Sequence, residues 1–372
     1  RLDDAIWAVR RLLARGPYGH RRRLVGVGVA VLAAAGIGFG LIASGLGGAG
    51  AGAPPTKTAA DPRLPALPPL APRYEGVPLS EHLAELDGGH APIDDLLTTS
   101  VLDDPDFARA VHGWIGYWTG PASAWFPGFL ERMAWLGPTV DSALMEATLP
   151  PSMRYLPLIE SGYDPRVRSR AQAVGLWQLM SSTAGELGLE VGDVVDERRH
   201  VHRSTDAAIR FLGRLHDDFG SWFWVLAAYN SGPSRVRGIL RRHAPGQEPT
   251  DSLFWALRAH FPRETREFVP KLYGAMWVAS HPEAYGYERP EPEPYAFDVV
   301  SVPDATTLHV VALAAGAEYA DVVRLNPEYV QAITPEDRRA AVRIPAGRAR
   351  TFLRIAPRIH AARRMAAPDH AS

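Results

Sequence analysis

The apolar pattern of the chain begins with residues 24–46, LVGVGVAVLAAAGIGFGLIASGL, which contain no charged residue. A helix of this length spans the hydrocarbon core of a bilayer, which is about 30 Å thick. Arg21, Arg22 and Arg23 precede the run directly, and no basic residue follows it closely. The positive-inside rule therefore predicts that residues 1–23 are cytoplasmic, that 24–46 cross the membrane, and that the rest lies outside.

A cleaved signal peptide is the alternative interpretation of the same segment. Ala49-Gly50-Ala51 and Ala51-Gly52-Ala53 are small-residue sequences typical of cleavage sites. The length of the apolar run favours an uncleaved anchor. Both interpretations predict that the chain beyond residue 47 is exported.

Helical spacing dominates the next part of the chain. Residues 47–75 are rich in Gly, Ala and Pro and indicate a semi-stiff linker between that region and the first run.

Residues 76–290 form a predicted helical region, with a core at about 145–285. Its helices include a periodic one after a start signal at Ser204-Thr205-Asp206, an apolar one at 222–229 and another at 264–278. No clear strand pattern occurs there, so a mainly α, all-helical domain is expected.

A different pattern follows the second linker, PEPEP at residues 290–294. Residues 295–302 alternate like a strand, and 341–345 read as a second short strand. Two helices are predicted between them, at 308–315 and 319–325. A small β-α-α-β domain is therefore expected at 295–357, followed by a flexible basic tail at 358–372.

Composition excludes several classes of function. The net charge is −1, which argues against a nucleic-acid partner. The chain contains no cysteine, so disulfides, thiolate nucleophiles and Cys-bound zinc are excluded. His200 and His202, with Asp196 and Glu197, lack the spacing of a metal site. We therefore predict no metal and no cofactor.

Glu160 is the candidate catalytic residue. It lies in PPSMRYLPLIESGYDP, residues 150–165, where Pro151 suits a helix start and Gly162 and Pro165 end the helix. The carboxylate is then in the last helical turn among apolar neighbours. The helix dipole and desolvation both raise its pKa, as a general acid requires. On this segment alone, a surface glutamate at a helix end is the favoured interpretation.

Two later motifs change that balance, namely Gly-Leu-Trp-Gln-Leu-Met at 175–180 and Ala-Tyr-Asn-Ser-Gly at 228–232. Together with Glu160-Ser161 they resemble the catalytic domain of lytic murein transglycosylases of the soluble-lytic-transglycosylase type, glycoside hydrolase family 23. The runs LPPSMRYLPLIESGYDP and FPRETREFVPKLYGAMWVA resemble the membrane-bound type D branch in particular. The resemblance covers roughly residues 130–285 and implies a lysozyme-like fold.

The resemblance also implies roles for individual residues. Glu160 matches the catalytic glutamate. The implied substrate-binding positions are Ser161, Ser169, Gly175, Gln178, Met180, Thr183, Tyr229 and Asn230. Two positions depart from the family pattern: Gln172 stands where many relatives carry Gly, and Phe268 stands where Tyr is usual.

Structural interpretations of these residues remain open. Thr183 and Glu186 have the spacing of a capping box, so Thr183 could start a helix. Gly175 could serve only close backbone approach, and Ser169 could cap a turn. Trp177 is expected in the core. Tyr229 and Asn230 could simply end a helix.

The implied reaction cleaves the bond between N-acetylmuramic acid and N-acetylglucosamine in peptidoglycan. A single glutamate protonates the glycosidic oxygen and then activates the muramoyl 6-hydroxyl, giving a 1,6-anhydro end. Asp164 and Glu186 are possible second carboxylates, although Asp164 fits a turn better. The alternatives are a non-catalytic peptidoglycan-binding scaffold and a hydrolytic muramidase similar to goose-type lysozyme.

Residues 296–347 resemble a divergent LysM module, a unit that binds N-acetylglucosamine-containing glycans. A domain that only packs on its neighbour is an equal alternative. The expected location is the inner membrane, with a single span and with the catalytic domain facing the periplasm. The expected partners are peptidoglycan strands and, through residues 24–46, the membrane.

Overall fold

The computed structural model describes residues 79, 96 and 99–366, with side chains up to residue 357. They divide into two compact units, one containing 99–191 and 197–295 and the other containing 192–196 and 296–366. The predicted cytoplasmic segment, membrane helix and first linker lie outside the described residues. No helix within the described ranges is long and apolar enough to cross a membrane.

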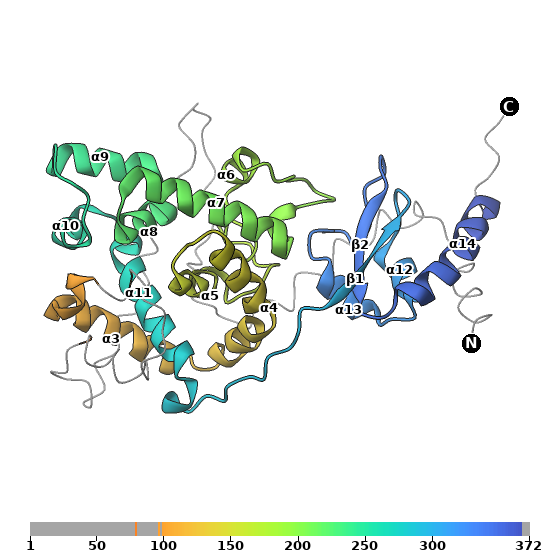
Figure 1. The fold of residues 1–372 in the computed structure, drawn as a ribbon, viewed down its shortest axis with the longest axis horizontal. Coiled ribbons are helices and arrows are strands. Elements are labelled where there is room, and N and C mark those ends of the chain that lie inside the picture. The colour runs from red at the N-terminus through yellow and green to blue at the C-terminus, as the bar shows by residue number, and fades with distance from the viewer. Residues whose placement is uncertain (1–78, 80–95, 97–98, 367–372) are drawn as a thin grey trace, which may run out of the picture. The chain divides into compact units, whose positions relative to one another are not determined.

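Helices make up the first unit (Figure 1). They are α3 (Pro105–Thr119), α4 (Phe126–Glu146), α5 (Leu156–Ser161), α6 (Ser181–Glu186), α7 (Val201–Phe219), α8 (Trp222–Ser231), α9 (Pro233–His243), α10 (Asp251–Leu257) and α11 (Arg263–Ser280). Short 3-10 turns occupy Ser100–Asp103, Pro151–Tyr155, Glu197–Arg199, Arg258–His260 and Pro282–Tyr285. The prediction of a mainly helical region is confirmed.

The start of α7 differs from the prediction. The Ser204-Thr205-Asp206 signal lies inside the helix, which begins at Val201. His200 is the N-cap, and its side chain accepts a hydrogen bond from the Arg203 N–H. Ser204 and Thr205 are instead buried, and the Thr205 hydroxyl accepts a bond from the Trp177 indole N–H at 3.0 Å. Residues that resemble a helix cap in the sequence are thus buried inside the unit, where Thr205 binds Trp177.

Helix α11 organises the core of this unit. It packs along α3 and also contacts α8 and α5 (Figure 1). The approach to α3 is close, because a Cβ at Gly274 would meet the Trp114 Cβ at 2.7 Å. Phe107 of α3 contacts the rings of Phe223 and Tyr273. These aromatic contacts bury apolar surface between helices that are far apart in the sequence.

The second unit has the predicted β-α-α-β order. Strands β1 (Phe297–Val302) and β2 (Ala340–Pro345) pair antiparallel, with Phe297 opposite Pro345 and Val302 opposite Ala340. Helices α12 (Leu308–Ala315) and α13 (Tyr319–Leu325) lie between them in sequence. The four predicted elements are confirmed to within two residues at each end.

The first part of the segment expected to be a flexible tail, 358–372, is helical. Helix α14 runs from Ala349 to Ala366 and continues through Pro357. Its first half carries Phe352, Ile355 and Ala356, which are buried in the core of the unit. Burial of this apolar stripe stabilises the helix before Pro357.

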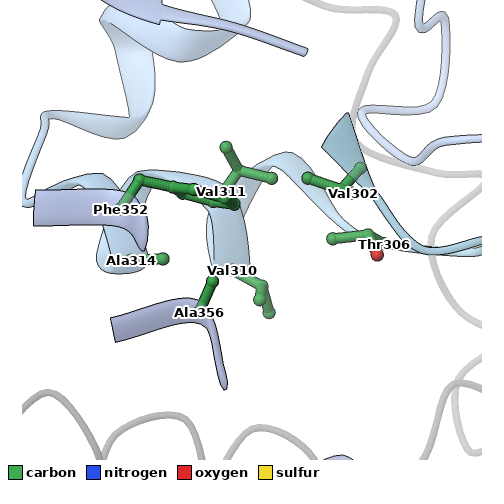
Figure 2. Close-up of a pocket in the computed structure, with 7 residues that line it drawn as sticks. All are labelled: Val302, Thr306, Val310, Val311, Ala314, Phe352 and Ala356. Carbon is green, nitrogen blue, oxygen red and sulfur yellow. The ribbon is translucent and has the colours of Figure 1, made fainter. Parts of the chain in front are cut away.

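A small apolar pocket lies between β1, α12 and α14 (Figure 2). It is lined by Thr306 and by apolar side chains that include Val302, Val311 and Phe352, and its cavity volume is only about 10 Å³. Small-molecule sites typically enclose about 300–1,000 Å³ and contain several polar groups. The pocket is therefore a packing gap rather than a site suited to a sugar.

A buried ion pair connects strand β2 to the segment that follows α13. The Arg343 guanidinium on β2 binds the Glu328 carboxylate, and their side chains are only 7% and 4% exposed. Arg343 also donates to the Leu325 carbonyl at 2.6 Å. Asn326 accepts from the Arg343 backbone N–H at 2.8 Å and donates to the Arg343 carbonyl at 2.6 Å. The end of α13 is thus tied to β2 by polar bonds.

We predict that Arg343→Met destabilises the second unit by about 3–5 kcal/mol, because Glu328 would keep a buried charge without its cation. Hydrogen exchange of the β1 and β2 amides measures this loss. Arg338→Met is the control, since the Arg338–Asp337 pair is exposed and such pairs contribute about 0–1 kcal/mol. Equal protection in wild type and Arg343→Met would contradict the prediction.

Candidate active site

Glu160 is the penultimate residue of α5, in its last turn as predicted. The helix ends because Gly162 adopts a left-handed conformation with φ of 59°, and its N–H bonds to the Leu158 carbonyl at 3.0 Å. A Cβ at Gly162 would lie 2.5 Å from the Phe129 ring. Tyr163 follows with φ of 61°, which is an uncommon conformation for a side-chain-bearing residue. This turn places the Glu160 carboxylate, whose Oε1 atom is buried, at the helix end.

The Gly-Leu-Trp-Gln segment links α5 to α8. The Leu176 carbonyl accepts a hydrogen bond from the Ser161 hydroxyl at 2.8 Å. The next carbonyl, that of Trp177, accepts from the Tyr229 hydroxyl at 2.6 Å. Two consecutive peptide groups therefore hold the residue after Glu160 and the Tyr of the Ala-Tyr-Asn motif.

This arrangement brings Tyr229 close enough to Glu160 for their charges to interact. Burial raises the pKa of Tyr229 well above its usual value, and the negative charge of Glu160 acts in the same direction. The phenol therefore stays protonated and keeps its bond to Trp177. Tyr229 and Glu160 therefore lie near each other in the structure.

Asn230, the neighbour of Tyr229, connects α8 to α11. Its amide nitrogen donates to the Glu264 carboxylate at 3.2 Å, and its amide oxygen accepts from the Thr265 hydroxyl at 2.8 Å. Both helices are thereby joined through one buried side chain. Asn230 does not end α8, which continues to Ser231 and stops at Gly232. These contacts fit a positioning role better than the substrate contact that we expected.

Ser161 and Gly175 also hold the Gly-Leu-Trp-Gln segment in place. The Ser161 side chain is buried and bonded to Leu176, so its contacts favour positioning over substrate binding. Gly175 has φ of 86°, and a Cβ there would lie 1.9 Å from the Arg198 carbonyl oxygen. Close backbone approach, one of the two interpretations of Gly175, is therefore supported. Trp177 is fully buried, as expected of a core residue.

The loop before this segment is folded by its own polar groups. The Ser169 hydroxyl accepts the Ala173 N–H at 3.0 Å, so it caps a turn while remaining partly accessible. Gln172 in that turn has φ of 68°, a conformation that favours the Gly found in many relatives. Gln178 donates to the carbonyls of Gly175 and Val167, which fixes its amide.

Met180 and Thr183 are the remaining groove candidates. Both are half-buried, so both can contact a ligand. The capping-box interpretation of Thr183 is wrong, because α6 begins at Ser181 and Met180 is its N-cap. Asp164 accepts the Arg166 N–H at 2.8 Å, the bond of the turn that we expected it to shape.

Sequence reasoning missed two cations near the site. Arg198 is buried and donates to the carbonyls of Gln172 and Leu179, which braces the loop. Lys271 on α11 donates to the Ile159 carbonyl at 3.0 Å, one residue before Glu160. Lys271 has a sequence signal, because it is the only charged residue between Phe268 and Ala279. Arg198 has none, since it lies in a polar run.

We predict that Gly175→Ala destabilises the first unit by more than about 1 kcal/mol, through the Arg198 clash and the positive φ. Gly188→Ala is the matched control, because Gly188 has φ of 82° but no atom within 4 Å of an added Cβ. The difference between the two variants in urea unfolding isolates the clash. Equal losses would contradict this assignment.

The chain is similar to known proteins over the part that contains this site. Residues 141–248 match the family described as Transglycosylase SLT domain, a range that includes Glu160, Gln178, Tyr229 and Asn230. Over 152 residues the chain is 34% identical to membrane-bound lytic murein transglycosylase D of Escherichia coli. The aligned region covers 41% of this chain and 33% of that relative. The chain thus spans about a third of the length of that relative.

Two further similarities are weaker. A putative tributyltin chloride resistance protein of Alteromonas sp. is 38% identical over 89 residues, or 24% of this chain and 43% of that protein. A solved structure of an inactive mutant of lytic transglycosylase Slt from Pseudomonas aeruginosa is 21% identical with a TM-score of 0.34, covering 56% of this chain and 33% of that chain. Residues 141–248 are thus similar to the transglycosylase SLT domain, and the chain is similar over 152 residues to the E. coli relative.

Proposed function

We propose that this chain is a peptidoglycan lytic transglycosylase in which Glu160 is the single acid/base. The observation that carries the proposal is the placement of Glu160 at the end of α5 beside Tyr229, within the SLT domain. The substrate is the glycan strand of peptidoglycan, cleaved between N-acetylmuramic acid and N-acetylglucosamine. The same proposal includes a lysozyme-like fold for the helical first unit.

In the first step, protonated Glu160 donates its proton to the glycosidic oxygen as the bond to the muramoyl C1 breaks. The resulting carboxylate then takes the proton of the muramoyl 6-hydroxyl, whose oxygen forms a new bond to C1. The product carries a 1,6-anhydro end, and no water is consumed. The raised pKa that the sequence predicts for Glu160 remains part of this proposal.

An internal nucleophile explains how one carboxylate suffices. A hydroxyl on the same sugar has a high effective molarity, so a second carboxylate is not needed to activate water. Glu186, a possible second carboxylate, is exposed at the end of α6. The Asp164 carboxylate accepts the Arg166 N–H and stabilises the turn after α5. Met180, Thr183 and the accessible part of Ser169 are the proposed substrate contacts. Gln178 is buried and its amide nitrogen is bonded to two carbonyls, so we propose that it holds the loop.

The location and the second unit complete the proposal. Residues 24–46 anchor the chain in the inner membrane with the SLT domain in the periplasm, in keeping with the membrane-bound relative from E. coli. The β-α-α-β order of the second unit supports a LysM-like module that binds peptidoglycan glycan. The apolar pocket of Figure 2 is not its glycan site.

The decisive experiment is digestion of isolated sacculi by the purified full chain, with muropeptides identified by mass spectrometry. We expect 1,6-anhydro ends from the wild type and no released product from Glu160→Gln, with an unchanged melting temperature. Glu186→Gln is the control and is expected to keep full activity, because the mechanism uses one carboxylate.

Other outcomes distinguish the alternative functions. Reducing ends in place of anhydro ends would show a hydrolytic muramidase. No product from the wild type, together with binding to sacculi, would show a scaffold. Wild-type turnover by a folded Glu160→Gln variant would exclude Glu160 as the acid/base.

The hydroxyl of Tyr229 provides a second prediction. Tyr229→Phe removes its bond to the Trp177 carbonyl, at a cost of about 0.5–1.5 kcal/mol of stability, and lowers kcat because the loop beside Glu160 is released. Tyr287→Phe is the matched control, since Tyr287 donates to the Trp118 carbonyl at 2.7 Å. Comparable stability losses with reduced kcat only in Tyr229→Phe are expected, whereas parallel kinetics would contradict a role at the site.

A further inference from the structure

Lys271 lies outside the matched SLT range yet reaches the helix that carries Glu160. Its ammonium group donates to the Ile159 carbonyl at 3.0 Å. It also lies 5.8 Å from the ring centres of both Trp114 and Trp118 of α3, within the range of cation–π attraction. Three helices, α3, α11 and α5, therefore meet at this one cation.

The bonded carbonyl belongs to the last turn of α5. The Leu158 and Pro157 carbonyls are bonded by the backbone N–H groups of Gly162 and Tyr163. The Ile159 carbonyl is bonded by Lys271 instead. A helix C-terminus carries partial negative charge, which disfavours a carboxylate and favours a cation. Lys271 thus supplies positive charge at the end of the helix where Glu160 must become negative.

We propose that Lys271 is a positioning residue for Glu160: it holds the last turn of α5 through the Ile159 carbonyl and supplies the positive charge that the Glu160 carboxylate needs once its proton has left. The inference rests on the proposed function, because it assigns Lys271 a part in that reaction. Lys271 acts through Glu160 and the helix end, and it is not assigned a contact with substrate.

The charged groups around Glu160 come from several helices. From α11 there are Lys271 and Glu264, and from α8 there is Tyr229, which stays protonated. From α4, Arg132 donates to the Gly162 carbonyl at 2.7 Å, but the charges with which it interacts are those of Asp164 and Glu131. Burial lowers the pKa of Lys271, whereas the charges of Glu160 and Glu264 act to raise it. Lys271 is therefore a buried cation that interacts with Glu160.

This charge affects the two steps in opposite directions. In the first step the proton leaves Glu160 for the glycosidic oxygen, and the ammonium stabilises the carboxylate that remains. In the second step Glu160 takes the proton of the 6-hydroxyl, and the same cation makes it a weaker base. Lys271 consequently sets the pH range in which Glu160 can perform both.

The experiment compares Lys271→Met, Lys271→Gln and Lys271→Arg in the full chain. Met removes the charge and the hydrogen bond, Gln removes the charge but can still donate to Ile159, and Arg keeps both. The readouts are the pH profile of kcat/KM on sacculi and a carbon-13 NMR titration of the Glu160 carboxyl group. Melting temperatures establish that each variant is folded.

The sign of the expected shift follows from the acid step. Activity requires protonated Glu160 and is lost as pH rises through its pKa, so a higher pKa extends activity to higher pH. Without the cation we expect the alkaline limb, and the NMR titration of Glu160, to move upward by about one pH unit in the Met and Gln variants. Lys271→Arg should leave both near the wild-type position.

A purely structural role would change rates or melting temperature without moving the titration. The proposal is overturned if the titration of Glu160 in folded Lys271→Gln stays within about 0.3 units of wild type, far less than an adjacent opposite charge produces. If Lys271→Met does not fold, Lys271→Gln and Lys271→Arg decide the question. The two failures are distinguishable, because the NMR arm does not require turnover: an active Glu160→Gln variant overturns the proposed function, whereas an unmoved titration of Glu160 in folded Lys271→Gln overturns this inference alone.

Discussion

The site depends on two consecutive carbonyl groups, those of Leu176 and Trp177. One accepts the hydroxyl of Ser161 from α5 and the other accepts the hydroxyl of Tyr229 from α8. Because a peptide unit is rigid, the two helices are held at a set separation. The segment that carries these carbonyls can lie so close to its neighbours only because Gly175 lacks a Cβ. The position of Glu160 relative to Tyr229 follows from this constraint.

Further bonds close a ring of contacts around Glu160. Asn230 joins α8 to α11, and Lys271 of α11 returns to α5 at Ile159. The backbone at the edges of this ring is held in uncommon conformations, with positive φ at Tyr163, Gln172 and Gln178. Such conformations persist where surrounding contacts outweigh their cost, and they concentrate at functional sites. The buried polar bonds described here supply that stabilisation and hold the backbone that carries Glu160.

Local patterns predicted much of the fold. Helices α12 and α13 begin and end at the residues predicted from the sequence. The end of α5 at Gly162 was predicted because a left-handed residue ends a helix and Gly adopts that conformation at little cost. The start of α7 was predicted wrongly, because burial of Ser204 and Thr205 inside the helix outweighs their local resemblance to a cap. Helix α14, which was not predicted, is stabilised by burial of Phe352 and Ile355.

The sequence alone established the candidate acid, its place at a helix end and the order of the motifs around it, because capping and apolar spacing are encoded within a few residues. It did not distinguish residues that hold the site from residues that face it. Ser161, Gly175 and Asn230 were expected to bind substrate, yet the fold gives them partners 15 to 35 residues away or a backbone atom at contact distance. Lys271 was not considered, since 112 residues separate it from Ile159. Long-range pairing depends on how helices pack, and only the tertiary structure determines which polar groups meet there.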